Sequence, residues 1–266
     1  MKQLRMIGLA AAAGLALMAA PAVSSAQPAN GAGPSPQPVM PQDVGERSDL
    51  ATVSAAEQAV VSGGAPALTA YVPDLQRIMS HMPNPYSKIE THGSRLEYHA
   101  DSLADFLLFS AAPAPAGVTE VVWTPAPYGR AGFLLGYYYD DNSQTDQAIL
   151  ALNAGLVAEP TNPSLLGERG AALNAAHRYE DGLLSYVAAL KTPDLSDKAR
   201  ARMLRGEGYA LTELNRLDEA EQAYRASLGF EPDNPLALNE LKYIAGLKAG
   251  AAPAPGGIIR STDPKP

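Results

Sequence analysis

The chain has 266 residues, of which 46% are hydrophobic, and this is enough to build a buried core. Its 28 Asp and Glu outnumber its 20 Lys and Arg, and this acidic balance argues against binding to nucleic acid or to anionic lipid. There is no Cys, which excludes disulfides, cysteine metal sites and attachment of lipid to a cysteine after a leader.

Residues 1–26 have the pattern of a secretory signal peptide. Two basic residues among the first five precede an apolar run over residues 6–20, and small residues end at Ala26. The run is shorter than the roughly 20 residues that span a bilayer, so cleavage is favoured over a membrane anchor. We therefore expect an exported bacterial protein, periplasmic or secreted, with no stable membrane insertion after cleavage.

Two segments are rich in Pro and Gly and poor in large apolar side chains. Residues 27–47 are predicted to be a disordered linker, and residues 250–266 a disordered tail. Neither segment can bury enough apolar area to offset the entropy lost on ordering. The folded part is therefore expected between them.

Residues 48–124 are predicted to form a small α+β region. A helix is expected to start at Ser48 and to end at Gly63, and a second is expected to begin at Pro73 and to end before Pro83. The segment 88–100 alternates in polarity on both sides of Gly93, which predicts a β-hairpin.

The predicted α+β region ends with one more helix and one more strand. Asp101 is expected to cap a helix that carries Leu103, Phe106 and Leu107. Residues 118–125, VTEVVWTP, read as a strand.

A spacing of small residues then recurs three times, with 12 and 7 residues between the members of each triplet. The triplets are Gly136, Ala148 and Gly155; Gly170, Gly182 and Ala189; and Gly208, Ala220 and Ser227. A larger residue follows each middle member by four positions: Leu152, Tyr186 and Tyr224. Paired helices need such short side chains where they cross, and larger ones fill the adjacent holes. The pattern predicts three helical hairpins that stack, because one hairpin cannot bury its apolar face alone.

This pattern, with 34 residues between Gly136 and Gly170, resembles the tetratricopeptide repeat (TPR) family over residues 129–249. The resemblance implies a mostly α fold, an α-solenoid of about three hairpins with a capping helix over residues 235–249. Gly170 and Gly208 are 38 residues apart, and we expect the four extra residues in the loop near residues 191–200. The family's leucine at Leu135 is replaced by Arg169 and Glu207 in the later units.

The resemblance further implies a concave groove lined by the first helix of each hairpin. Carried onto this sequence, the predicted binding residues are Arg130, Phe133, Tyr137, Asp140, Asn174, Arg202, Arg205, Tyr209, Asn239 and Tyr243. Arginines and tyrosines suit a protein or peptide partner that carries carboxylates and apolar side chains. The lysine and asparagine clamp by which some members hold a C-terminal carboxylate is not matched, because only Arg202 offers a corresponding cation.

No motif for catalysis or for a cofactor stands out. GxSxG, P-loop and GxGxxG patterns are absent, and the histidines, of which His92 and His99 are expected to be near each other, lack a metal-binding spacing. We therefore expect a non-enzymatic scaffold or adaptor with no cofactor and no metal. Two alternatives stay open: an enzyme or small-ligand protein with its site in residues 48–124, beside Trp123, and a structural unit that forms a homo-oligomer.

Overall fold

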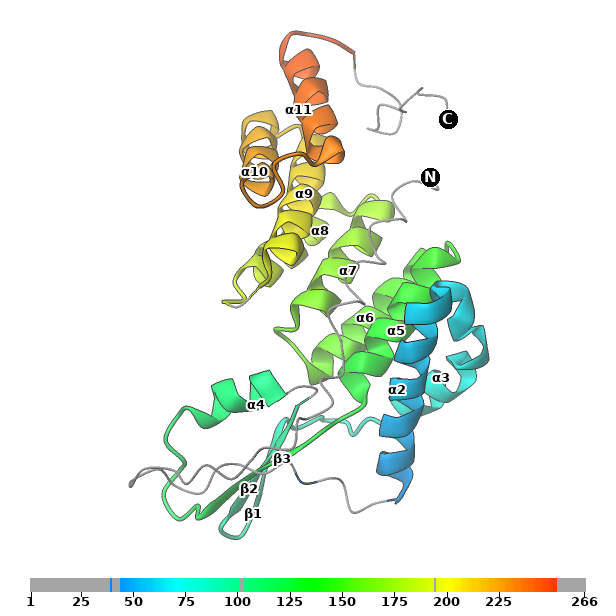
Figure 1. Cartoon of the computed structure of the whole chain (residues 1–266), viewed down its shortest axis with the longest axis vertical. Helices are drawn as coiled ribbons and strands as arrows, with labels where there is room; N and C mark the ends of the chain where they lie inside the picture. The colour runs from blue at the N-terminus through cyan, green and yellow to red at the C-terminus, as the bar shows by residue number, and fades with distance from the viewer. Residues whose placement is uncertain (1–38, 40–43, 101–102, 194, 253–266) are drawn as a thin grey trace. The chain divides into compact units, whose positions relative to one another are not determined.

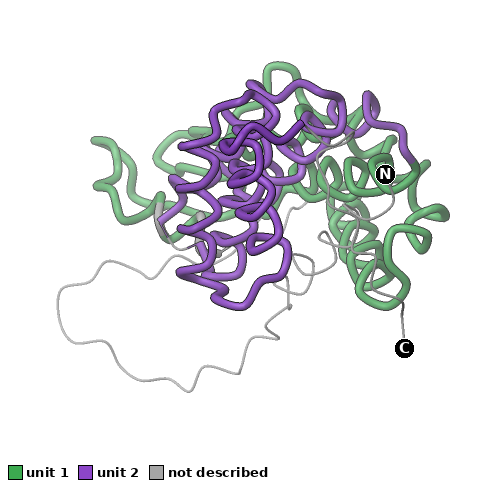
Figure 2. The backbone as a smooth tube through the Cα atoms, turned by 90° about the horizontal axis from the view of Figure 1, so that it is seen from above, with its two compact units in different colours: residues 1–142, 150–160 green, residues 143–149, 161–266 purple. Residues whose placement is uncertain are grey.

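The computed structural model describes residues 39, 44–100, 103–193 and 195–252. The predicted signal peptide, Asp101 and most of the predicted tail lie outside the described residues. The chain divides into two compact units (Figure 2), the first of residues 1–142 and 150–160, and the second of residues 143–149 and 161–266. We call them unit 1 and unit 2.

The fold is mostly helical, with one small sheet (Figure 1). The elements up to the end of the first hairpin are α2 (Val44–Gly63), the 3-10 helix η2 (Ala65–Ala70), α3 (Val72–Ser80), β1 (Ile89–His92), β2 (Arg95–His99), α4 (Leu103–Ser110), β3 (Glu120–Thr124), α5 (Tyr128–Asp141) and α6 (Thr145–Ala158). The remaining elements are α7 (Pro163–Ala175), α8 (Tyr179–Leu190), α9 (Asp197–Glu213), α10 (Leu217–Phe230) and α11 (Pro235–Lys248). None of the described helices is long and apolar enough to cross a membrane.

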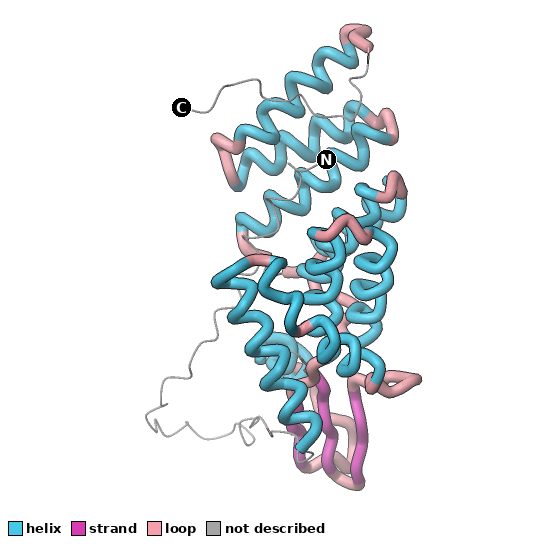
Figure 3. The backbone as a smooth tube through the Cα atoms, turned by 90° about the vertical axis from the view of Figure 1, so that its right-hand side faces the viewer, coloured by secondary structure: helices cyan, strands magenta, loops and turns pink. Residues whose placement is uncertain are grey.

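The three strands of unit 1 lie side by side in the order β1-β2-β3 (magenta in Figure 3). β1 and β2 are antiparallel and joined at Gly93, whose positive φ of 66° suits a residue without a side chain. The predicted hairpin and the predicted strand before Pro125 are both confirmed, and β3 runs parallel to β2. Phe106 of α4 stacks on Trp123 of β3 with ring centroids 6.0 Å apart, so aromatic packing joins α4 to the sheet.

The helices of unit 1 share a second core. Buried side chains of α2, η2, α3 and α5 meet there, among them Val53, Leu68, Leu75 and Leu134. The helix predicted to begin at Ser48 begins at Val44 instead, so residues 44–47 of the predicted linker are helical. The shared core shows that α5, the first helix of the first predicted hairpin, packs on α2, η2 and α3. All four helices lie in unit 1.

Helix pairs α5–α6, α7–α8 and α9–α10 confirm the three predicted hairpins, and α11 confirms the predicted final helix. In each pair a glycine of the first helix meets the large residue predicted to fill the hole beside it. A Cβ atom added at these glycines would lie 2.4 Å from Leu152 at Gly136, 2.8 Å from Tyr186 at Gly170 and 2.8 Å from Tyr224 at Gly208. Real Cβ atoms do not approach so closely, so the spacing of small residues is a requirement of the packing.

In unit 2 the stacking continues from one hairpin to the next. The ring of Tyr186, on α8, touches Gly170 of α7 and also Gly206 of α9, where an added Cβ would lie 2.3 Å from the ring. The methyl group of Met203 would lie 2.4 Å from a Cβ at Gly167, which brings α9 against α7 as well. α11 then packs on α10 through a core that includes Tyr224 and Ile244.

The expectation of a longer loop near residues 191–200 is correct only in part, because residues 191–196 connect α8 to α9 but residues 197–200 are helical. α9 begins at Asp197, eleven residues before Gly208, whereas α7 begins seven residues before Gly170. The difference is one additional turn at the start of α9. Ser196 caps this turn, since its Oγ accepts a hydrogen bond from Ala199 N, and an acidic residue follows at the first position. A good cap therefore starts the helix earlier than the repeat requires.

Candidate functional site

The four predicted binding residues of α5 belong to unit 1, and three of them contribute to its packing. Arg130 Nε donates to Glu57 Oε1 of α2 at 2.8 Å, and Arg130 Nη2 donates to Ser54 Oγ at 3.0 Å. Phe133 and Tyr137 pack against the core that α5 shares with α2, η2 and α3, and Asp140 is half-buried. The stripe that was expected to meet a partner is thus largely engaged by the unit's own helices.

Two of the three arginines of α9, Arg202 and Arg205, are engaged in ion pairs inside unit 2. Arg202 Nη1 lies 2.6 Å from Glu168 Oε1 of α7, and these side chains are only 14% and 8% exposed. Arg205 pairs with Glu231, which follows α10, and the Arg205 side chain is 12% exposed. A largely buried charge is tolerated when an opposite charge compensates it, so both arginines act in the packing of the helices.

Asn174 lies inside unit 2. It is 3% exposed, and its Nδ2 atom donates to the Gly206 carbonyl of α9 at 3.4 Å. Its Oδ1 atom faces α8, because a Cβ at Gly182 would lie 2.3 Å from it. The side chain therefore lies between three helices and is not open to a partner.

Tyr209, Asn239 and Tyr243 are the predicted binding residues of unit 2 that remain half-buried and partly open. Tyr209 of α9 makes an edge contact with Tyr179 of α8, with ring centroids 6.3 Å apart and an interplanar angle of 69°. Burial raises the pKa of the Tyr209 phenol, and the negative charge of Glu213 raises it further. The phenol is therefore neutral and able to donate a hydrogen bond at physiological pH.

Two carboxylates beside these tyrosines were missed by the sequence analysis. Burial raises the pKa of the Glu240 carboxyl to about 7, and the charge of Glu213 contributes in the same direction. Glu240 Oε2 is buried and has no hydrogen-bond partner among the described residues. Neither Glu213 nor Glu240 forms an ion pair with a Lys or Arg that the structure describes.

We call the half-buried polar side chains of this region the α9–α11 polar surface: Tyr179, Tyr209, Glu213, Asn239, Glu240 and Tyr243. Its carboxylates give it a negative charge, and burial raises the pKa of the Tyr179 and Tyr209 hydroxyls. A signal for Glu240 was present in the sequence, because residues 162–168 (NPSLLGE) and 234–240 (NPLALNE) share their Asn, Pro and Glu. Glu213 and Tyr179 had no such signal, since they follow from how α8 and α9 pack.

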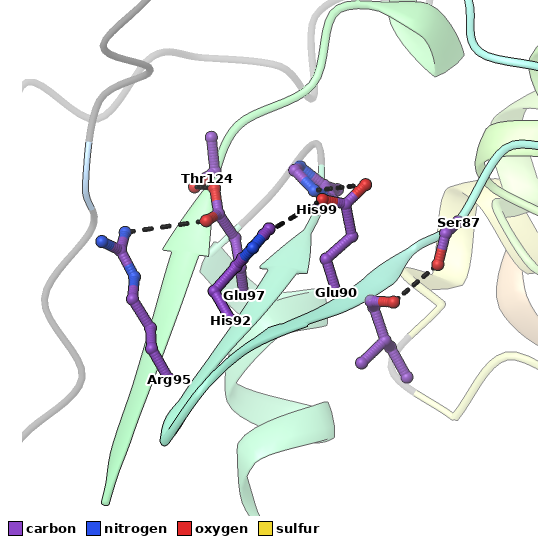
Figure 4. A network of polar contacts seen from close by, with 8 residues as sticks. Ser87, Glu90, His92, Arg95, Glu97, His99 and Thr124 are labelled. Atoms are coloured by element: carbon purple, nitrogen blue, oxygen red, sulfur yellow. Dashed lines mark hydrogen bonds and ion pairs between the residues drawn. The ribbon is translucent and has the colours of Figure 1, made fainter. Parts of the chain in front are cut away.

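A second polar group lies on the sheet of unit 1 (Figure 4). His92 Nε2 is 3.2 Å from one oxygen of Glu90, and His99 Nε2 is 3.7 Å from the other. On the neighbouring strands Glu97 accepts a hydrogen bond from Thr124 Oγ1. The two histidines are thus brought to one glutamate, as the hairpin suggested. No group of three or more His, Asp or Glu side chains in the described ranges is arranged to hold a metal ion.

Comparison with known proteins finds no matching family model and no matching curated protein. Among solved structures, 46% of the chain is similar to 94% of the first TPR domain of Spaghetti (RPAP3) bound to the HSP90 peptide SRMEEVD, with 28% identity and a TM-score of 0.42. The Arabidopsis OM64 TPR domain matches 44% of the chain over 93% of its own length, with 22% identity and a TM-score of 0.40. The second TPR domain of human RPAP3, in complex with the HSP70 peptide SGPTIEEVD, matches 41% of the chain over 88% of its own length, with 29% identity and a TM-score of 0.38.

Proposed function

We propose that this chain is a non-catalytic interaction protein whose unit 2 binds a segment of a partner protein through the α9–α11 polar surface. One observation carries the proposal. Buried glycine and tyrosine contacts fix α7, α8 and α9 against one another, and α11 packs on α10 through a shared core, while Tyr209 of α9 and Asn239 and Tyr243 of α11 remain partly open. A surface held rigid before binding loses little conformational entropy when a partner docks.

The side chains of this surface suit recognition of a polypeptide. Tyrosine contributes a large and rigid apolar area together with a hydroxyl group, and it is common among the residues that dominate binding energy. The amide of Asn239 both donates and accepts, as a peptide backbone requires. The function needs no cofactor, because shape and hydrogen bonding on a preformed surface are sufficient.

A photo-crosslinking experiment tests the proposal. A photoreactive amino acid replaces Asn239 or Tyr243 in turn, and matched controls carry it at Leu184 of α8 or Arg225 of α10, whose side chains are 67% and 68% exposed. We expect the α11 positions to crosslink to the same partner protein, and the control positions to give none of it. Equal crosslinking from the controls would refute the surface, and crosslinks to a second copy of the chain would support the self-association alternative instead.

We also propose that the protein acts in the bacterial cell envelope after export. The charged start, the apolar run and the small residues up to Ala26 support this, since together they have the pattern of a secretory signal peptide. N-terminal sequencing of the protein recovered from the periplasmic fraction should give Gln27 as the first residue. Full-length protein that begins at Met1 and stays in the cytoplasm would refute export.

A further inference from the structure

Glu168 and Glu240 occupy the same place in two helices of unit 2. Asn162 caps α7 and Asn234 caps α11, and each is followed by a Pro at the first helical position. A Glu stands six residues after each Asn. Because both helices begin with the same cap, the two carboxylates leave them at equivalent positions.

The surroundings of these two carboxylates differ in one respect. Glu168 receives the guanidinium of Arg202 from the following hairpin at 2.6 Å. Glu240 has no such arginine among the described residues, and its Oε2 atom is buried without a hydrogen bond. The unit therefore shows what a carboxylate at this position binds, and it shows an equivalent carboxylate whose cation is missing from the described chain.

The neighbours of Glu240 also favour a positive charge beside it. Glu213 lies close enough to raise the pKa of the Glu240 carboxyl, so the two acids repel each other when both are ionised. The phenol of Tyr209 interacts with both of them and with Tyr179. An aromatic ring attracts a cation through its face, so this group offers carboxylates and π-electrons together.

None of the three arginines of α9 supplies this positive charge. Arg200 donates to backbone carbonyls of the segment between α8 and α9 and of the last residue of α8. Arg202 and Arg205 are held by Glu168 and Glu231, as described above. The same pairing removes them as receptors for an acidic peptide, which was the partner expected from the sequence. The charge left uncompensated beside Tyr209 is negative.

We propose that the α9–α11 polar surface binds an arginine or lysine side chain of the partner segment, with Glu240 and Glu213 receiving it as Glu168 receives Arg202. This inference rests on the proposed function and specifies its partner as cationic. Arginine is favoured over lysine, because its planar guanidinium can bond both oxygens of a carboxylate and also stack on a tyrosine ring.

The test uses fluorescein-labelled peptides of about a dozen residues, built from Gly, Ser and Ala, in which about three positions carry arginine, citrulline or glutamate. Citrulline has nearly the shape of arginine without its charge. Fluorescence anisotropy with the intact chain, in low salt and at about pH 8, should give at least about tenfold tighter binding of the arginine peptide than of the citrulline peptide. The glutamate peptide should bind more weakly than either.

Variants separate the site from the general attraction of an acidic protein for a cation. Glu213→Gln with Glu240→Gln should weaken arginine-peptide binding at least about tenfold, whereas Glu180→Gln with Asp233→Asn, an equal change of charge at exposed positions, should change it less than about twofold. Equal losses in both double variants would overturn the site.

Two further outcomes distinguish the inference from the proposed function. Citrulline or glutamate peptides that bind as tightly as the arginine peptide would overturn the cationic partner and leave segment binding standing. If no peptide binds the intact chain while Asn239 still crosslinks to a partner, the cation inference fails and the proposed function survives. If both experiments give nothing, both fail.

Discussion

Glu240→Gln keeps the shape of the side chain and removes its charge, so its effect on stability should depend on pH. The pKa of the Glu240 carboxyl is about 7 in the folded chain, against an ordinary value of 4.5. The folded state thus holds this proton more tightly than the unfolded state does. The resulting stabilisation is fully present below about pH 4.5 and is lost as the pH rises through about 7.

The size of the effect follows from that difference. Each pKa unit corresponds to about 1.4 kcal/mol, so a shift from 4.5 to about 7 corresponds to about 3.5 kcal/mol at most. Glu240 is half-buried, and solvent screening reduces the expected value to about 1–2 kcal/mol. Above neutrality, the ionised Glu240 carboxylate therefore lowers the free energy of unfolding by about this amount.

Urea unfolding at about pH 5 and about pH 8.5 measures the free energy of unfolding of the wild-type chain and of the variant. We expect Glu240→Gln to raise the free energy of unfolding by about 1–2 kcal/mol at the higher pH and to leave it nearly unchanged at the lower one. Glu180→Gln, at an exposed position, serves as the control and should show no such dependence. The reasoning is refuted if the variant is less stable than the wild type at the higher pH, or if its gain is equal at both.

Two further predictions concern the contacts that hold unit 2 together. Gly206→Ala should lower the free energy of unfolding by about 1–3 kcal/mol, because the new methyl would overlap the enclosed ring of Tyr186. Gly229→Ala, in the exposed part of α10 with open space around it, should instead raise it by up to about 1 kcal/mol, and the same urea titration compares the two. Arg202→Ala should cost about 3–5 kcal/mol because it leaves Glu168 buried and unpaired, while Arg202→Met combined with Glu168→Leu should recover most of that loss. A double variant as unstable as the single one would contradict this account of the ion pair.

The hairpins could be predicted from sequence because their decisive contacts repeat at fixed spacings. Gly170 and Tyr186 meet because two helices of a hairpin cross at a constant place, and Gly208 and Tyr224 meet for the same reason. The additional turn of α9 could not be placed in this way. Its start depends on the cap at Ser196, which is a local hydrogen bond and not part of the repeat.

The site was harder to predict, because the sequence shows residue types on a helical stripe and does not show their pairing. Arg130 was expected to be available, but Glu57, which is 73 residues away, engages it in an ion pair. Arg202 and Glu168 are 34 residues apart, whereas the repeat between α7 and α9 is 38 residues, so the spacing gave no signal for that pair either. The negative character of the α9–α11 polar surface appears only when such pairs are assigned.

The internal pairing of the arginines decides which substitutions can test binding. Replacing Arg202 and Arg205 by Ala would leave Glu168 and Glu231 without their cations. A loss of partner capture in such a variant would then follow from damaged packing as readily as from a lost contact. Glu240→Gln avoids this ambiguity, since it is expected to stabilise the fold above neutrality and to weaken cation binding at the same pH. If this variant becomes more stable and binds less, its loss of binding does not come from damaged packing.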